Sequence, residues 1–313
     1  MSVGRVARLV GPRRIELTTI EYSAPRPRQV LVRIVASGVC ASELHAWEGP
    51  LAEYPADVGH EPVGIVEETG REVRSLRAGD VVTGRFGPAF ADLVLVERED
   101  LVAVPAGLAL DDALGEPLGC VVEARRRTPL GLGDDVAVVG AGYMGLLMIE
   151  LLGISGAGTI VAIDPRADAR EVALELGAGE ACGPEDASVD PAARQFDIVI
   201  EASGTQTGLD TATGLVREHG TISILGFHQS GLRSVDLETW NWKSIDVVNA
   251  HVRRRDLLND AIRRGLELVR RERIHPARLL THRFPLEQVD DAFVSLDPKP
   301  AGFVKAIVVN GGA

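Results

Sequence analysis

The chain has 313 residues, of which 45% are hydrophobic and 25% charged, and its formal net charge is −12. This is the composition of a globular protein long enough for two domains. An acidic chain without basic blocks is a poor candidate for binding nucleic acid or anionic membranes, so neither partner is expected. Three cysteines are too few for a disulfide framework and fit a reducing compartment. The N-terminus lacks the apolar segment of a secretory signal, so we expect a cytoplasmic protein.

The first 110 or so residues contain short β-branched runs bounded by Gly, Pro or Asp, which predict strands. The runs are VLVRIVASGV (30–39), EPVGIVEET (61–69), GDVVTG (79–84) and FADLVLVE (90–97). A helix-like stretch follows from Ala109 to about Arg127.

Strands and helices then alternate, which predicts an α/β fold with a parallel, doubly wound sheet. The candidate strands are VAVVG (136–140), TIVAID (159–164), FDIVIEAS (196–203), TISILG (221–226) and IDVVNA (245–250). The candidate helices or loops between them lie around 143–154, 166–177, 205–218 and 232–244. A helical run (256–272) then leads to a last strand, FVKAIVV (303–309), and we expect this tail to return to the first unit.

The segment 136–163 is apolar almost throughout and long enough to span a bilayer. Glycines divide it into short blocks, however, and Glu150 lies inside it. A buried strand, a buried helix and a second buried strand explain it better than a membrane span.

The stretch VAVVGAGYMG carries the GxGxxG pattern of a dinucleotide site at Gly140, Gly142 and Gly145. It follows a predicted strand and opens a predicted helix, and Asp164 ends the next strand, which is the context the pattern requires. Gly140 allows the tight turn, Gly142 lets the backbone approach a pyrophosphate, and Gly145 permits close packing of helix and strand.

Asp164 favours NAD over NADP, because its carboxylate accepts hydrogen bonds from the ribose hydroxyls and repels a 2′-phosphate. Arg166, two residues later, weakens that preference. We also expect Tyr143 and Met144 in the glycine loop, and Phe227 after a later strand, to contact the cofactor.

Cys40 in GVCASELH and His60 in VGHEPVG supply a thiolate and an imidazole close together in the chain. With a carboxylate, they form a donor set that suits zinc. The third ligand is left open between Glu61, adjacent to His60, and Glu116 in GEPLG.

These motifs and VVGAGYMG, in this order over nearly the whole chain, resemble the zinc-dependent medium-chain dehydrogenases. The polyol (sorbitol-type) and threonine-type branches look most similar, because their third motif also begins with an acidic residue before Pro. The resemblance implies a GroES-like β-barrel catalytic domain made of 1–128 and 252–313, and a Rossmann domain at 129–251. It also implies homodimers or homotetramers.

The resemblance further implies roles for individual residues. Cys40 and His60 would bind zinc, Glu61 would be a direct or alternating ligand, and Glu116 a ligand or an outer partner. Ser42 would take the substrate proton and His45 would pass it to solvent. Lys305, in GFVKAIVV, would approach the pyrophosphate.

The chain departs from most zinc members of the family at one place. Their structural zinc lobe, with four cysteines, would lie between VVTG and FADLVLV, where this chain has only RFGPA (85–89). Three cysteines cannot make such a site, so we expect one catalytic zinc and no structural zinc.

We therefore expect NAD-linked interconversion of a secondary alcohol and its ketone at one zinc. The closest branches suggest a polyol, sugar, cyclitol or amino alcohol as substrate. Two alternatives remain open: a zinc-free enone or quinone reductase of the same fold, and a non-catalytic NAD-binding protein.

Overall fold

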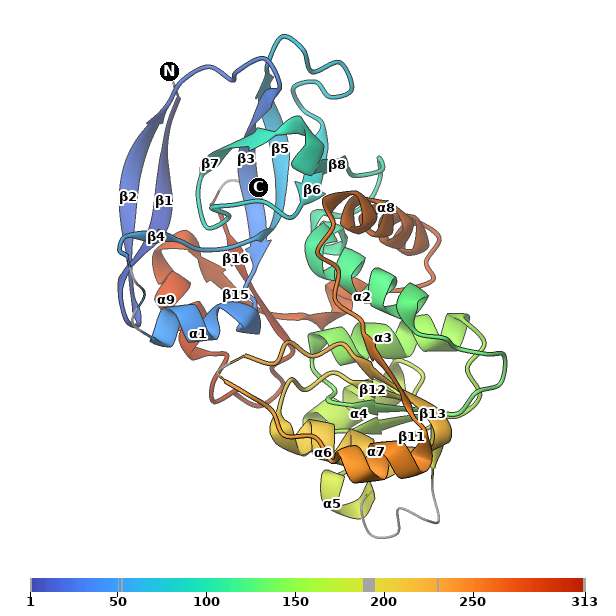
Figure 1. The fold of residues 1–313 in the computed structure, drawn as a ribbon. Coiled ribbons are helices and arrows are strands. Elements are labelled where there is room, and N and C mark those ends of the chain that lie inside the picture. The colour runs from blue at the N-terminus through green and yellow to red at the C-terminus, as the bar shows by residue number, and fades with distance from the viewer. Residues whose placement is uncertain (1, 50, 52, 188–194, 230, 312–313) are drawn as a thin grey trace. The chain divides into compact units, whose positions relative to one another are not determined.

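The structure, a computed structural model, describes residues 2–49, 51, 53–187, 195–229 and 231–311. The chain forms two compact units (Figure 1). The first unit consists of Met1–Gly119 with Arg254–Ala313, and the second of Cys120–Arg253.

The second unit contains a six-stranded parallel sheet with the order β11-β10-β9-β12-β13-β14. In chain order this is 3-2-1-4-5-6, the order of a doubly wound dinucleotide-binding fold, so the predicted fold class is confirmed. The short β11 was not predicted. The strands are β9 (Val136–Val139), β10 (Ile160–Ile163), β11 (Glu180–Cys182), β12 (Phe196–Glu201), β13 (Val216–Ile224) and β14 (Asp246–Asn249).

Helices connect these strands, and α3 (Tyr143–Ile154) is the most apolar of them, with every residue from Leu146 to Leu152 buried. A helix that is apolar on all sides has to be buried. No helix in the described part of the chain is long and apolar enough to cross a membrane. The other helices of this unit are α4 (Ala167–Glu175), α5 (Pro184–Ala187), α6 (Gln206–Leu215) and α7 (Leu237–Lys243).

The first unit is built mainly from a barrel-like sheet with the order β15-β16-β3-β5-β6-β8, in which β7 also pairs with β3. A three-stranded sheet, β2-β1-β4, completes it. The strands are β1 (Ser2–Gly11), β2 (Arg14–Tyr22), β3 (Gln29–Gly38), β4 (Ala56–Asp57), β5 (Glu61–Thr69), β6 (Val81–Gly84), β7 (Leu93–Glu97), β8 (Leu101–Ala103), β15 (Leu280–Pro285) and β16 (Lys305–Val309).

The last strand, β16, pairs antiparallel with β3, so the C-terminal tail does return to the first unit. The predicted helix-like stretch from Ala109 begins as a 3₁₀ turn and continues as α2. The remaining helices are α1 (Leu44–Glu48), α2 (Gly115–Arg127), α8 (Arg255–Arg270) and α9 (Val289–Val294), with 3₁₀ helices η1 (Ala41–Glu43), η2 (Arg98–Asp100), η3 (Leu110–Ala113), η4 (Pro276–Leu279) and η5 (Leu286–Gln288).

Candidate functional site

Cys40, His60 and Glu61 come together because β3 and β5 pair antiparallel, with Gly38 opposite Glu61. Cys40 follows the end of β3, and His60 precedes the first residue of β5. One ligand atom from each side chain lies within 4.8 Å of the other two. A sulfur, a nitrogen and a carboxylate oxygen at this spacing are donors that zinc prefers, so the residues present fit the metal that the sequence predicts.

Glu43 supports this cluster and was not singled out from the sequence. Its Oε2 lies 3.3 Å from His60 Nδ1, and its Oε1 accepts a hydrogen bond of 2.8 Å from the backbone N–H of Gly59. Metal-binding histidines usually donate the N–H of their second ring nitrogen to a carboxylate, a backbone carbonyl or water, and this bond orients the ring. An acidic residue three positions after Cys40, in CASE, was the signal available in the sequence.

Burial would lower the pKa of His60, but hydrogen bonds with Cys40 and Glu43 raise it to about 11. These hydrogen bonds favour the protonated form of the imidazole. A metal ion bound to the ring would have to displace that proton.

Lys305 of β16 pairs with Glu61, and both side chains are buried. Its Nζ lies 2.6 Å from Glu61 Oε2. Burial alone would raise the pKa of Glu61 and lower that of Lys305. The opposite charge of each partner outweighs burial, so the pKa of Glu61 is lowered and that of Lys305 is raised. The ammonium group of Lys305 therefore compensates the charge of Glu61 in this structure. That Lys305 contacts the pyrophosphate of a cofactor stays a prediction.

Glu116, the other carboxylate left open as a ligand, lies buried in the first turn of α2. It belongs to no possible metal-binding group among the residues that the structure describes. Its charge contributes to the raised pKa of Lys305. Of the two candidates for third ligand, only Glu61 lies in the cluster.

Ser42 and His45, the predicted proton relay, lie in η1 and α1. The Ser42 hydroxyl donates a hydrogen bond of 3.1 Å to Cys40 Sγ, whereas His45 is exposed. Trp47, two residues later, is buried and stacks on Phe293 at 5.5 Å between ring centroids, so it is a core residue.

The glycine loop between β9 and α3 has the geometry expected of each glycine. Gly140 has a φ of +102°, and a Cβ there would lie 2.7 Å from the Ser203 nitrogen. A Cβ at Gly145 would lie 2.0 Å from the Gly140 oxygen.

Gly142, in contrast, has no heavy atom within 4 Å of where its Cβ would be. It is the N-cap of α3 and provides no side-chain hydrogen bond to the first turn. An open backbone at a helix N-terminus suits a phosphate, so the loop fits a dinucleotide. Of the other two predicted loop residues, Tyr143 is buried and Met144 is half-buried.

The last residue of β12 is a buried acid that the sequence motifs did not indicate. Glu201 is fully buried, and its Oε2 lies 2.7 Å from His228 Nε2. Its Oε1 accepts hydrogen bonds from Ser203 Oγ and the Gly204 backbone. The pair joins the loops after β12 and β13, next to Phe227, whose side chain is 45% exposed. An acidic residue ending the apolar run FDIVIE was the available signal.

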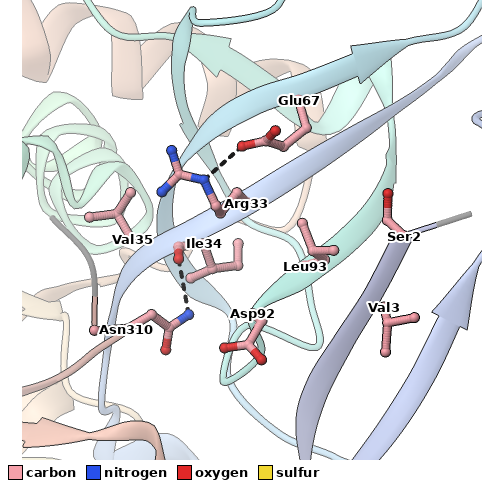
Figure 2. Close-up of a pocket in the computed structure, with 10 residues that line it drawn as sticks. Ser2, Val3, Arg33, Ile34, Val35, Glu67, Asp92, Leu93 and Asn310 are labelled. Carbon is pink, nitrogen blue, oxygen red and sulfur yellow. Dashed lines mark hydrogen bonds and ion pairs between the residues drawn. The ribbon is translucent and has the colours of Figure 1, made fainter.

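A cavity of 470 Å³ lies elsewhere in the first unit, and none of the predicted site residues lines it (Figure 2). Two polar pairs lie in its lining: Arg33 Nε lies 2.7 Å from Glu67 Oε1, and Asn310 Nδ2 donates to the Ile34 carbonyl. We assign it no role.

Two protein-family models match the chain. Residues 26–106 match the alcohol dehydrogenase GroES-like domain, and residues 144–268 match the zinc-binding dehydrogenase domain.

Individual proteins match as well. A probable zinc-binding alcohol dehydrogenase of Mycobacterium tuberculosis is 31% identical over 67% of this chain and 65% of its own length. Sorbitol dehydrogenase of Ovis aries is 25% identical over 90% of each chain. Among solved structures, a protein of Sinorhizobium meliloti described as a zinc-binding dehydrogenase, bound to NADP, superposes with a TM-score of 0.88 at 26% identity. That match covers 99% of this chain and 100% of the other.

Proposed function

Because the chain belongs to the zinc-type medium-chain dehydrogenase family, we propose that it interconverts a secondary alcohol and its ketone with NAD. The chemistry would take place at one zinc held by Cys40, His60 and Glu61. The observation that carries the proposal is the position of their three donor atoms, all within 4.8 Å of one another. The likeness to sorbitol dehydrogenase supports a hydroxyl-rich substrate such as a polyol, sugar, cyclitol or amino alcohol.

When bound, the zinc would polarise the substrate oxygen and the dinucleotide would exchange hydride with the carbon. The chain's own residues prepare the site. Glu43 fixes the ring of His60 through Nδ1, which leaves the other ring nitrogen for the metal. Lys305 keeps Glu61 ionised in a buried position, and Glu116 acts on Lys305 as an outer partner.

Ser42 is the residue we propose to take the substrate proton. Its hydroxyl lies beside Cys40, one of the proposed ligands, and needs only to donate and accept a hydrogen bond. His45, which is exposed, is the residue we propose to pass the proton on to solvent. A zinc-free reductase of this fold would have no use for the joined thiol, imidazole and carboxylate.

The first experiment measures bound metal by mass spectrometry in the full-length chain, prepared without chelators. We expect about one zinc per chain in the wild type and almost none in Cys40→Ala. Cys182→Ala, which changes a cysteine outside the cluster, should keep its zinc. A panel of secondary alcohols with NAD should then give NADH.

The outcomes separate the alternatives. A wild type without zinc would refute the alcohol-dehydrogenase proposal in favour of a zinc-free reductase. Zinc and tight NAD binding without turnover of any alcohol would instead support a non-catalytic NAD-binding protein. Two zinc ions per chain would mean that a second metal site had been missed.

A further inference from the structure

Helix α1, which carries His45, is a single turn whose position depends on one buried side chain. A turn of five residues is not stable by itself, because its few hydrogen bonds do not offset the cost of ordering the backbone. Trp47 of this helix is 3% exposed, and its indole ring stacks on Phe293 of α9 with 16° between the ring planes. Its carbonyl accepts a hydrogen bond of 2.6 Å from the backbone N–H of Arg13, between β1 and β2. These contacts with distant parts of the chain hold α1 in place.

Asp290 of α9 connects Trp47 to a strand. Its Oδ1 accepts a hydrogen bond of 3.0 Å from the indole N–H of Trp47, and its Oδ2 accepts one of 3.0 Å from the backbone N–H of Ile15 in β2. The carboxylate thus ties α1 to β2 as well as to α9. Stacking alone leaves a ring free to slide and turn in its plane, whereas the bond to the N–H fixes one edge of the indole. Asp290 therefore sets the orientation of Trp47.

The orientation of Trp47 decides where His45 points. Each helical residue is turned by about 100° from the one before, so residues two positions apart lie on nearly opposite faces. Leu44, three positions before Trp47, packs against the same core cluster, whereas His45 is exposed. Holding Trp47 in the core therefore keeps the imidazole of His45 on the outer face of α1.

We propose that Asp290 is a positioning residue, which holds His45 in place for proton transfer through the hydrogen bond to Trp47. The inference rests on the proposed function, because it takes His45 as the group that passes the proton to solvent. In this role Asp290 acts through Trp47 and takes no proton itself. A proton moves only between groups at hydrogen-bond distance, and a displacement of about 1 Å can slow such a step by about 100-fold.

The first test observes His45 itself and needs no alcohol or cofactor. NMR spectra of the full-length chain labelled with ¹⁵N-histidine record the imidazoles of its seven histidines, and His45→Gln identifies the signals of His45. Asp290→Asn keeps one side-chain oxygen but cannot accept both bonds. We expect the His45 signals to shift or broaden in this variant, because α1 loses a contact that holds it. Asp291→Asn removes the same charge from the next, exposed residue of α9 and should leave the His45 signals unchanged.

The second test is a double-mutant cycle on the oxidation of a secondary alcohol with NAD. Asp290→Asn should lower kcat by about 10-fold, leave KM within about threefold of the wild type and keep about one zinc per chain. If Asp290 acts through His45, its loss should lower kcat of the His45→Gln variant by less than about twofold, because the group it positions is already missing. Trp47→Phe keeps an aromatic ring without the N–H and should resemble Asp290→Asn in both tests.

Either test can overturn the inference. An unchanged His45 spectrum in Asp290→Asn would show that the carboxylate does not position the imidazole. Independent losses of kcat in Asp290→Asn and His45→Gln, which multiply in the double variant, would make Asp290 merely structural. If Asp290→Asn does not fold, Trp47→Phe takes its place in both tests. A wild type that oxidises no alcohol, together with a displaced His45 signal in Asp290→Asn, would count against the proposed function alone.

Discussion

At the scale of single residues, two charged side chains support the metal cluster: Glu43 beside His60 and Lys305 beside Glu61. Cys40, His60 and Glu61 were chosen as candidates because residue type and spacing point to zinc. Glu43 was missed, because its role depends on where its side chain lies relative to His60 Nδ1. The Lys305–Glu61 pair could not be found by spacing at all, since the two residues are far apart in sequence and meet only when β16 pairs with β3.

Glu43 gives a prediction at this scale. Glu43→Gln removes the negative charge beside His60 and loosens the ring, so zinc affinity should fall by about 10- to 100-fold. Competition with a chromophoric chelator measures the change. Glu48→Gln, in the neighbouring α1, removes only a surface partner of Arg13 and should bind zinc like the wild type. Unchanged affinity in Glu43→Gln would show that the carboxylate does not orient the ligand.

Secondary-structure elements were predicted best where their pattern is strongest. The apolar strands and α3 of the doubly wound unit agree with the predicted segments, because burial on both faces leaves a continuous hydrophobic run. β11 was missed, since its three residues, EAC, carry no such run. β2 was not singled out for a related reason: most of its residues are exposed and polar, so it lacks a clear alternation.

An ion pair between Arg5 of β1 and Asp92, directly before β7, leads to a prediction about how stability depends on pH. Arg5 Nε lies 2.8 Å from Asp92 Oδ2, and this hydrogen bond holds the pKa of Asp92 below its ordinary value. A carboxyl group with a lower pKa in the folded state stabilises the fold above its unfolded pKa, and this contribution is lost as the pH falls through the folded pKa. The wild type should therefore lose stability more steeply than Asp92→Asn between about pH 5 and pH 3.

Urea unfolding midpoints at several pH values check this prediction. Asp80→Asn removes an ion pair with the highly exposed Arg77. In this variant the urea midpoint should fall with pH as steeply as in the wild type. Parallel pH profiles for the wild type and Asp92→Asn would show that the Arg5–Asp92 pair contributes nothing to the acid sensitivity.

At the scale of the whole molecule, the sequence predicted two kinds of unit and the return of the C-terminal tail, because the change from strand-rich to alternating pattern is strong. It did not indicate which surfaces stay exposed. The parallel sheet ends at β14, and no described strand covers its outer edge. Val247 on this strand is 41% exposed, and Trp242 of α7, close before it in the chain, is 81% exposed.

An unpaired strand edge next to exposed apolar side chains promotes association between chains, and monomeric proteins usually avoid it. We therefore predict a homodimer in which β14 faces its own copy across a two-fold axis, since such an interface is self-complementary. Light scattering coupled to size exclusion should give a dimer mass for the wild type and a monomer mass for Trp242→Lys combined with Val247→Lys. Leu132→Lys changes another exposed apolar residue, one that lies before the central strand β9, so this variant should stay dimeric. A monomeric wild type would refute the dimer. A dimer that persists with both lysines would show that the contact between copies lies elsewhere.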